Sequence, residues 1–197
     1  MDSVLPFALA GLALTGSPGP ATLSLAATGA AYGGRRGLGF LAGICSGMVV
    51  VMAVTASGVT GAILAVPGAA PAFGLAGAAY ILYLAYRIAT APPLGSEAGE
   101  RRAPSYPGGV FLALVNPKAY AAMAALFSGF VLLPEQLALD ATVKLLGLLA
   151  MIVCVNLAWL FGGAALTGFL HDPRLSRGIN IAFAVLLIVS VIFALPI

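Results

Sequence analysis

Long apolar runs separated by short polar segments dominate the chain. Six such runs cover residues 4–31, 38–66, 71–89, 108–133, 143–170 and 178–195. Each is close to or longer than the roughly 20 apolar residues that a helix needs to cross the hydrocarbon core of a bilayer. The pattern therefore predicts an all-α integral membrane protein with six transmembrane helices.

Two of these runs are interrupted by helix-breaking residues near their middle. The interruptions are Ser17-Pro18-Gly19-Pro20 and Asn116-Pro117-Lys118. Proline has no N–H for the helical ladder, and its ring crowds the preceding turn. In hydrocarbon an unpaired backbone group costs several kcal/mol, so broken backbone occurs only where protein buries it or a cavity borders it. We therefore expect the first and fourth helices to be broken near the midplane, and the two breaks to border a site.

The breaks divide the chain into two comparable halves. Pro18 and Pro117 lie 99 positions apart in a chain of 197 residues. Each half holds three predicted spans, so the second half enters the membrane with the opposite orientation. This is the plan of inverted-repeat transporters, whose substrate sites lie at the repeat interface. We predict one membrane domain, made of a first repeat at 1–91, a cytoplasmic loop at 92–107 and a second repeat at 108–197.

Composition and charge support a membrane protein and give its orientation. Hydrophobic residues make up 61% of the chain and charged residues 8%, against about 25% charged in soluble domains. The net charge of +3 is too diffuse to indicate nucleic-acid binding. The connections after the first, third and fifth spans hold the arginines, namely Arg35, Arg36, Arg87, Arg101, Arg102, Arg174 and Arg177. The positive-inside rule makes that side cytoplasmic and places both termini outside.

Lys118 is the charged side chain nearest to the centre of a predicted span. It lies about ten residues into the fourth run, roughly 15 Å deep at 1.5 Å per residue. A charge at that depth costs about 2.5–3.5 kcal/mol on insertion scales, so it is a functional candidate by default. Its alternative role is structural, as a donor to carbonyls that Pro117 frees, such as that of Ala113. Lys144, Glu135 and Asp140 are expected at the outer edge of the membrane and are weaker candidates.

The breaks also expose backbone groups of both polarities. The carbonyls of Leu14, Gly16 and Ala113 lose helical partners and could meet an ammonium group. The half-helix that begins near Ala21 has free N–H groups and a positive dipole end, which suit a carboxylate. Donors beside acceptors match a zwitterion, so the pattern permits a small amino-acid-like substrate. The candidate substrate-binding residues are Ser17, Pro18, Gly19, Pro20, Asn116, Pro117, Lys118 and Asn156.

The sequence carries no pattern typical of an enzyme or of a bound cofactor. It has no phosphate-binding Walker A motif, no His, Cys and carboxylate spacing suited to a metal, and no nucleophile–base set. Gly39, Gly43 and Gly47 form a doubled G-x-x-x-G in the second run. Such a face favours close helix packing, either within the chain or between protomers.

Taken together, these motifs resemble the LysE/RhtB superfamily of bacterial amino-acid exporters over nearly the whole chain. The resemblance rests on Pro18-Gly19-Pro20, Gly34-x-Arg36-Gly37, Gly77-Ala78-Ala79-Tyr80-Ile81-Leu82-Tyr83-Leu84 and Asn116-Pro117-Lys118. It implies proton-driven export of amino acids or related metabolites across a bacterial inner membrane, with a homodimer among the expected assemblies. It also implies a site at the two breaks. The chain lacks the carboxylate near a span centre that proton relays commonly use.

Other functions remain open at this point. The wider superfamily includes exporters of other solutes, among them metal cations, although the positive Lys118 and the lack of acidic or thiolate ligands argue against a cation. A passive channel subunit is a second alternative. A purely structural membrane subunit is a third, against which the paired breaks argue.

Overall fold

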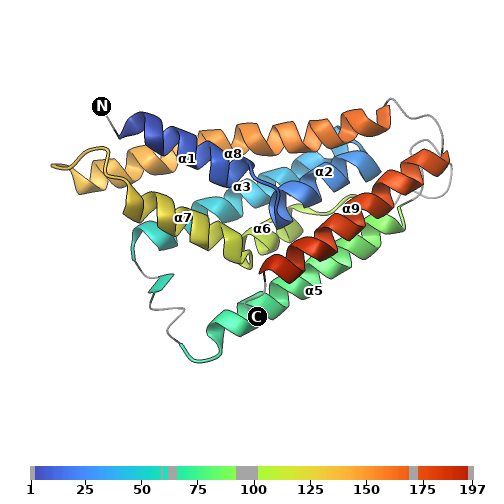
Figure 1. The fold of residues 1–197 in the computed structure, drawn as a ribbon, viewed down its shortest axis with the longest axis horizontal. Helices are drawn as coiled ribbons and strands as arrows, with labels where there is room; N and C mark the ends of the chain where they lie inside the picture. The colour runs from blue at the N-terminus through green and yellow to red at the C-terminus, as the bar shows by residue number, and fades with distance from the viewer. Residues whose placement is uncertain (1–2, 59, 62–65, 92–101, 169–172, 195–197) are drawn as a thin grey trace.

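The regular secondary structure of the described residues is entirely helical. The computed structural model describes residues 3–58, 60–61, 66–91, 102–168 and 173–194 (Figure 1). The helices are α1 (Val4–Gly16), α2 (Pro20–Tyr32), α3 (Gly34–Ala56), α5 (Ala69–Ala89), α6 (Tyr106–Leu114), α7 (Pro117–Gly129), α8 (Leu137–Gly168) and α9 (Pro173–Ala194). The predicted loop at 92–107 lies mostly outside the described residues.

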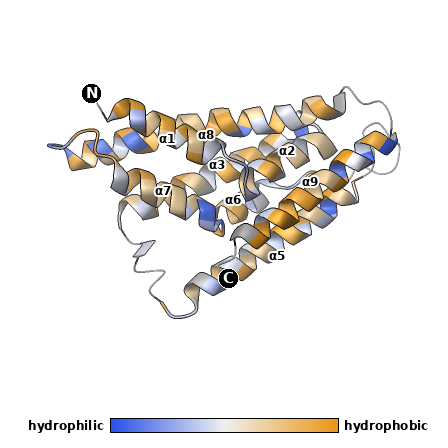
Figure 2. Ribbon diagram, in the orientation of Figure 1, coloured by the Kyte–Doolittle hydropathy of each residue, from blue (hydrophilic) through white to orange (hydrophobic). Residues whose placement is uncertain are grey.

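Four helices, α3, α5, α8 and α9, are each long and apolar enough to cross a membrane. The pairs α1–α2 and α6–α7 meet the same criteria only jointly. They bend by 56° and 61° at their breaks, so the spans number up to six if each bent pair is one. Most residues of the helices are apolar, and the most hydrophilic ones lie chiefly near helix ends and at the α6–α7 junction (Figure 2). The prediction of an all-α, multi-pass membrane protein is confirmed, whereas the inverted repeat stays a prediction.

Several predicted helix boundaries are wrong by four residues or more. Helix α9 begins at Pro173 rather than at residue 178, and α7 ends at Gly129 rather than at residue 133. Helix α3 begins at Gly34 rather than at residue 38, because Gly33 makes the turn from α2 alone with a φ of +86°. Only glycine adopts that left-handed backbone readily. Helix α8 begins at Leu137 rather than at residue 143. The charged residues Asp140 and Lys144 do not end the helix, because protein covers their side chains.

Local sequence explains both breaks. Gly19 is the N-cap of α2 and Asn116 the N-cap of α7, and each is followed by proline at the first helical position. Proline suits that position because its missing N–H would have no helical partner there. The Asn116 side chain accepts a hydrogen bond from the Lys118 N–H at 3.2 Å, as asparagine commonly does at an N-cap.

Glycines allow two pairs of helices to pack in backbone contact. At the α2–α8 crossing, a Cβ on Gly29 would overlap the Leu160 carbonyl, and a Cβ on Gly163 would overlap the Ala26 carbonyl. At the α3–α6 crossing, Gly43 lies in the same way against Tyr106. Gly47 also faces α6, whereas Gly39 has open space. Two glycines of the predicted G-x-x-x-G face therefore serve packing within the chain.

An arginine–tyrosine cluster ties three segments together at the end of the molecule that carries the arginines. The Tyr32 hydroxyl at the end of α2 donates to the Arg87 carbonyl of α5 at 3.1 Å. The Arg87 guanidinium lies over the rings of Tyr32 and Tyr83, at 6.0 and 5.8 Å from their centroids. It also donates to the Arg102 carbonyl, just before α6. We call this end of the molecule the arginine end.

The opposite end holds an ion pair between two residues that the sequence led us to expect at the outer edge of the membrane. Asp140 and Lys144 are instead 4% and 3% exposed, with their charged atoms 2.7 Å apart. Asp140 accepts from the N–H groups of Leu132 and Leu133, at 2.6 and 2.9 Å. Lys144 donates to the carbonyl of Phe127, at 3.2 Å, and to that of Phe130. The pair thereby fixes the end of α7 to the start of α8.

The glycine crossing gives a stability test with a built-in control. Gly163→Ala should destabilise the protein, because the new methyl group would overlap the Ala26 backbone. Backbone atoms, unlike a flexible side chain, have no alternative rotamer that relieves the overlap. Gly162→Ala has open space and should be neutral or gain up to about 1 kcal/mol of helix propensity. Thermal unfolding of both variants in detergent would measure this. Equal midpoints would contradict the close α2–α8 packing.

Removing one partner of the buried ion pair should destabilise the α7–α8 connection strongly. Lys144→Met leaves the Asp140 carboxylate buried without its cation, which typically costs about 3–5 kcal/mol. Lys144→Met combined with Asp140→Asn should cost less than the two single changes together, since neither charge is then left alone. Unfolding midpoints of the cycle check this, with the exposed Thr142→Ala as control. Additive effects would show that the two charges do not interact.

Candidate functional site

Lys118 joins the two breaks. Its ammonium group donates to the Ser17 carbonyl at 2.7 Å and to the Pro18 carbonyl at 3.3 Å. The structural alternative expected this ammonium on carbonyls that Pro117 frees, such as that of Ala113. The acceptors are instead carbonyls of the other break, so a role as donor to backbone groups stays open with different partners. The Ala113 carbonyl instead accepts from the Asn116 N–H at 3.4 Å. The charged group of one break is therefore paired with the backbone of the other.

Gly19 makes room for the lysine. A Cβ at this position would lie 2.8 Å from Cδ and 2.9 Å from Nζ of Lys118. Its φ of −176° is extended backbone, which any residue adopts. A side chain at this position would displace the flexible end of Lys118 from its present place. The glycine therefore matters for space and not for its conformation, a distinction that the sequence motif does not reveal.

Three side chains satisfy further backbone groups at the first break, and two of them, Trp159 and Thr22, were not among the predicted site residues. Trp159 of α8 donates its indole N–H to the Gly16 carbonyl at 3.2 Å. The Ser17 hydroxyl donates to the Leu14 carbonyl at 3.0 Å. The Thr22 hydroxyl accepts from the Gly19 N–H at 3.0 Å. Trp159 is the one tryptophan in the chain and lies in the middle of an apolar run. This position was the feature of the sequence that could have marked it as a candidate.

A small cavity lies beside Lys118 and extends from the breaks between α1, α3, α7 and α8. We call it the inner cavity, and its volume is about 50 Å³. Its residues are Leu14, Thr15, Gly19, Ala21, Thr22, Ile44, Met48, Asn116, Lys118, Ala119, Ala122, Met123, Ile152 and Asn156.

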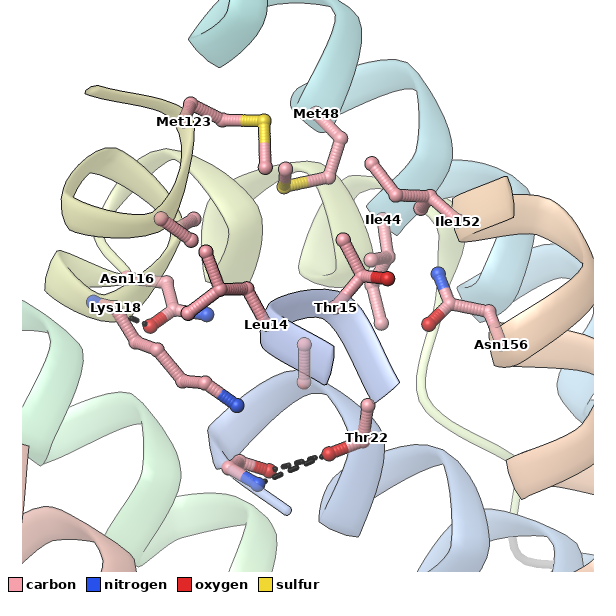
Figure 3. A pocket seen from close by; sticks show the side chains of 14 residues that line it. Leu14, Thr15, Thr22, Ile44, Met48, Asn116, Lys118, Met123, Ile152 and Asn156 are labelled. Carbon is pink, nitrogen blue, oxygen red and sulfur yellow. Dashed lines mark hydrogen bonds between the residues drawn. The ribbon is translucent and has the colours of Figure 1, made fainter. Parts of the chain in front are cut away.

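The inner cavity has a polar and an apolar end. Lys118, Asn116 and Thr22 lie toward one end, and Met48 and Met123 lie together at the other (Figure 3). Asn156 projects from α8 at the side, and its amide nitrogen is 3.7 Å from the sulfur of Cys45. Pockets that enclose small ligands usually measure about 300–1,000 Å³. In the form seen here, the inner cavity is therefore too small to enclose an amino acid.

The predicted site residues fall into three groups. Gly19, Asn116, Lys118 and Asn156 line the inner cavity. Ser17 contributes its carbonyl to Lys118. The three prolines shape the breaks without lining the inner cavity, and they border a separate depression beside α9; they are Pro18, Pro20 and Pro117.

Comparison with known proteins places the chain in a family. The model of the LysE type translocator family matches residues 12–195. Cysteine/O-acetylserine efflux proteins of Escherichia coli O139:H28, Escherichia coli K12 and Shigella sonnei are each 34% identical to the chain over 178 residues. That match covers 87% of this chain and 87% of each relative. No solved structure matches the chain. The chain belongs to the LysE type translocator family of membrane proteins.

Proposed function

We propose that the protein exports small, uncharged amino acids from the cytoplasm and that they bind at the inner cavity. The observation that carries this proposal is the ammonium group of Lys118, held on the Ser17 and Pro18 carbonyls at the wall of a cavity between the breaks. A lysine at this depth of a membrane protein is costly and commonly marks a substrate pathway.

The hydrogen bonds of Lys118 suggest how a zwitterion would bind. The substrate carboxylate takes the place of the Ser17 and Pro18 carbonyls as partner of the ammonium. The first N–H groups of α2, at Ala21 and Thr22, have no acceptor within the helix and add a positive dipole end. The substrate ammonium then pairs with the carbonyls that Lys118 has released. Each charge keeps a partner throughout this exchange.

The apolar end of the inner cavity favours a short, uncharged side chain. Met48 and Met123 are adaptable thioethers, and Ile44 and Ile152 complete this part of the wall. The curated relatives are named for efflux of cysteine and O-acetylserine, which are small neutral amino acids. We therefore propose these two compounds as the first substrates to test. A basic side chain would find only the thioethers and apolar groups there.

Binding of either compound requires the inner cavity to widen. Helix α1 buries only Phe7 and Gly11, whereas nearly all of α2 is buried. The tight glycine crossing of α2 and α8 and the Arg87 cluster lie toward the arginine end. We therefore propose that widening toward the opposite end involves α1 and α7.

The remaining parts of the proposal rest on the resemblance and on the distribution of arginines. We propose a bacterial inner-membrane location, with the arginine end in the cytoplasm and both termini outside. We also propose two inverted repeats of three spans, a homodimer and proton antiport.

Lys118→Met should lower efflux steeply, because methionine keeps the length of the side chain but cannot attract a carboxylate. Since this variant also leaves the Ser17 and Pro18 carbonyls without the lysine, its thermal unfolding is measured beside its efflux. Lys118→Arg should retain part of the activity, because it keeps the charge. Radiolabelled cysteine and O-acetylserine would be loaded into proteoliposomes of purified protein, and their loss followed over time. We expect efflux by Lys118→Met to fall by at least about a hundredfold, since a charge-assisted bond is lost from the binding site.

Gly162→Ala serves as control, since it has open space and lies away from the inner cavity. Normal efflux by Lys118→Met would remove Lys118 from the mechanism. If the unaltered protein releases neither compound, the proposed substrates are wrong, and divalent cations become the next solutes to test.

Proton antiport predicts that export depends on the pH gradient. A more acidic exterior should accelerate efflux, and a protonophore should remove the acceleration. Counterflow, in which external unlabelled substrate speeds the exit of labelled substrate, distinguishes a carrier from a passive channel. Saturable counterflow without any effect of the gradient would contradict proton coupling while leaving the carrier in place.

A further inference from the structure

A second depression lies on the α9 side of Lys118. It runs between the start of α2, the start of α7 and the last turns of α9, and its volume is about 580 Å³. From α9 it is lined by Leu186, Val189 and Ser190, and from α7 by Ala121. We call it the α9 groove. Its volume falls within the range of small-ligand sites, about 300–1,000 Å³, unlike that of the inner cavity.

Lys118 and Gly19 line both spaces. The lysine side chain occupies the room that a Cβ of Gly19 would take. Lysine has a flexible four-carbon stem, and this stem lies where the two spaces adjoin. A rotation of this stem would carry the ammonium group from one space to the other without any change in the helices.

On two other sides the described helices cross in backbone contact. Gly43 of α3 lies against Tyr106 of α6, and Gly29 of α2 against Leu160 of α8. These crossings leave no room for a side chain. Of the inner cavity and the α9 groove, both lined by Lys118, the groove is the larger.

We propose that the α9 groove is a second binding position, which holds the exported amino acid after it leaves the inner cavity. This inference rests on the proposed function. The substrate carboxylate stays with the Lys118 ammonium as the stem rotates. The substrate ammonium faces the Pro18 carbonyl and the Ser190 hydroxyl oxygen. This hydroxyl donates its proton to the Leu187 carbonyl at 2.7 Å, so its oxygen is free to accept. The substrate side chain lies against Leu186 and Val189.

Charge complementarity favours a carboxylate-bearing solute as the occupant. Among the described residues that line the groove, the one charged group is the Lys118 ammonium, which pairs with a carboxylate. A lipid acyl chain or an apolar face of a second copy would match Leu186 and Val189 but would offer the ammonium nothing.

Filling the groove tests the proposal. Val189→Phe should lower efflux of O-acetylserine more than efflux of cysteine, because the larger side chain has less room beside α9. We expect the rate of O-acetylserine efflux divided by that of cysteine efflux to fall by about tenfold, which is the scale of steric discrimination in an apolar site. Ile188→Phe is the matched control, because Ile188 is 41% exposed on the opposite face of α9 and does not line the groove. Ala121→Leu fills the groove from α7 and repeats the test if Val189→Phe does not fold.

The outcomes separate this inference from the proposed function. If the unaltered protein exports neither compound, the proposed function fails first. If it exports both, and if folded Val189→Phe and Ala121→Leu leave the ratio unchanged, the groove does not hold the substrate. An equal loss for both compounds in variants with normal thermal stability would also overturn the proposal, because a blocked binding position must discriminate by size.

Discussion

The structure depends on the need to satisfy backbone carbonyls that two proline breaks set free within hydrocarbon. An unpaired carbonyl there costs several kcal/mol, and proline has no N–H with which to pair one. Nearby groups satisfy some of these carbonyls, as the Ser17 hydroxyl does for the carbonyl three residues before it, and the others take partners from elsewhere in the chain. Trp159 of α8 takes the Gly16 carbonyl, and Lys118 of α7 takes those of Ser17 and Pro18. Two of these three carbonyls are thus held by a charged group at the wall of a cavity.

This arrangement links fold and function in the same atoms. A lysine that satisfies backbone groups is stable without a substrate, and the same lysine can exchange those groups for a carboxylate. The tight crossings of α2 with α8 and of α3 with α6 keep the surrounding helices in place at the arginine end. Helix α1, by contrast, buries only Phe7 and Gly11. The rigid and the loosely packed parts of the protein therefore meet at the breaks.

The sequence predicts what depends on local chemistry. Apolar run length predicted the helices, and the prolines predicted both breaks, since neither effect depends on distant residues. The sequence did not predict Trp159, because nothing along the chain shows that α8 passes beside Gly16. It also misplaced Asp140 and Lys144, whose burial arises from the folding of residues 127–133 over them. The space that Gly19 leaves for Lys118 joins residues 99 positions apart, and only the tertiary structure reveals it.

The length of α8 has a consequence for how the protein sits in a bilayer. Its 32 residues extend about 48 Å at 1.5 Å per residue, whereas the hydrocarbon core is about 30 Å thick. Tilts of known transmembrane helices reach only about 40°, so part of α8 must project into the headgroup region. If Asn156 and Ile152 lie near the midplane, Lys144 lies about 15 Å and Asp140 about 21 Å from it along the helix at 1.5 Å per residue. The buried ion pair then lies at the edge of the hydrocarbon core, so the protein cover over it separates two charges from both lipid and headgroup water.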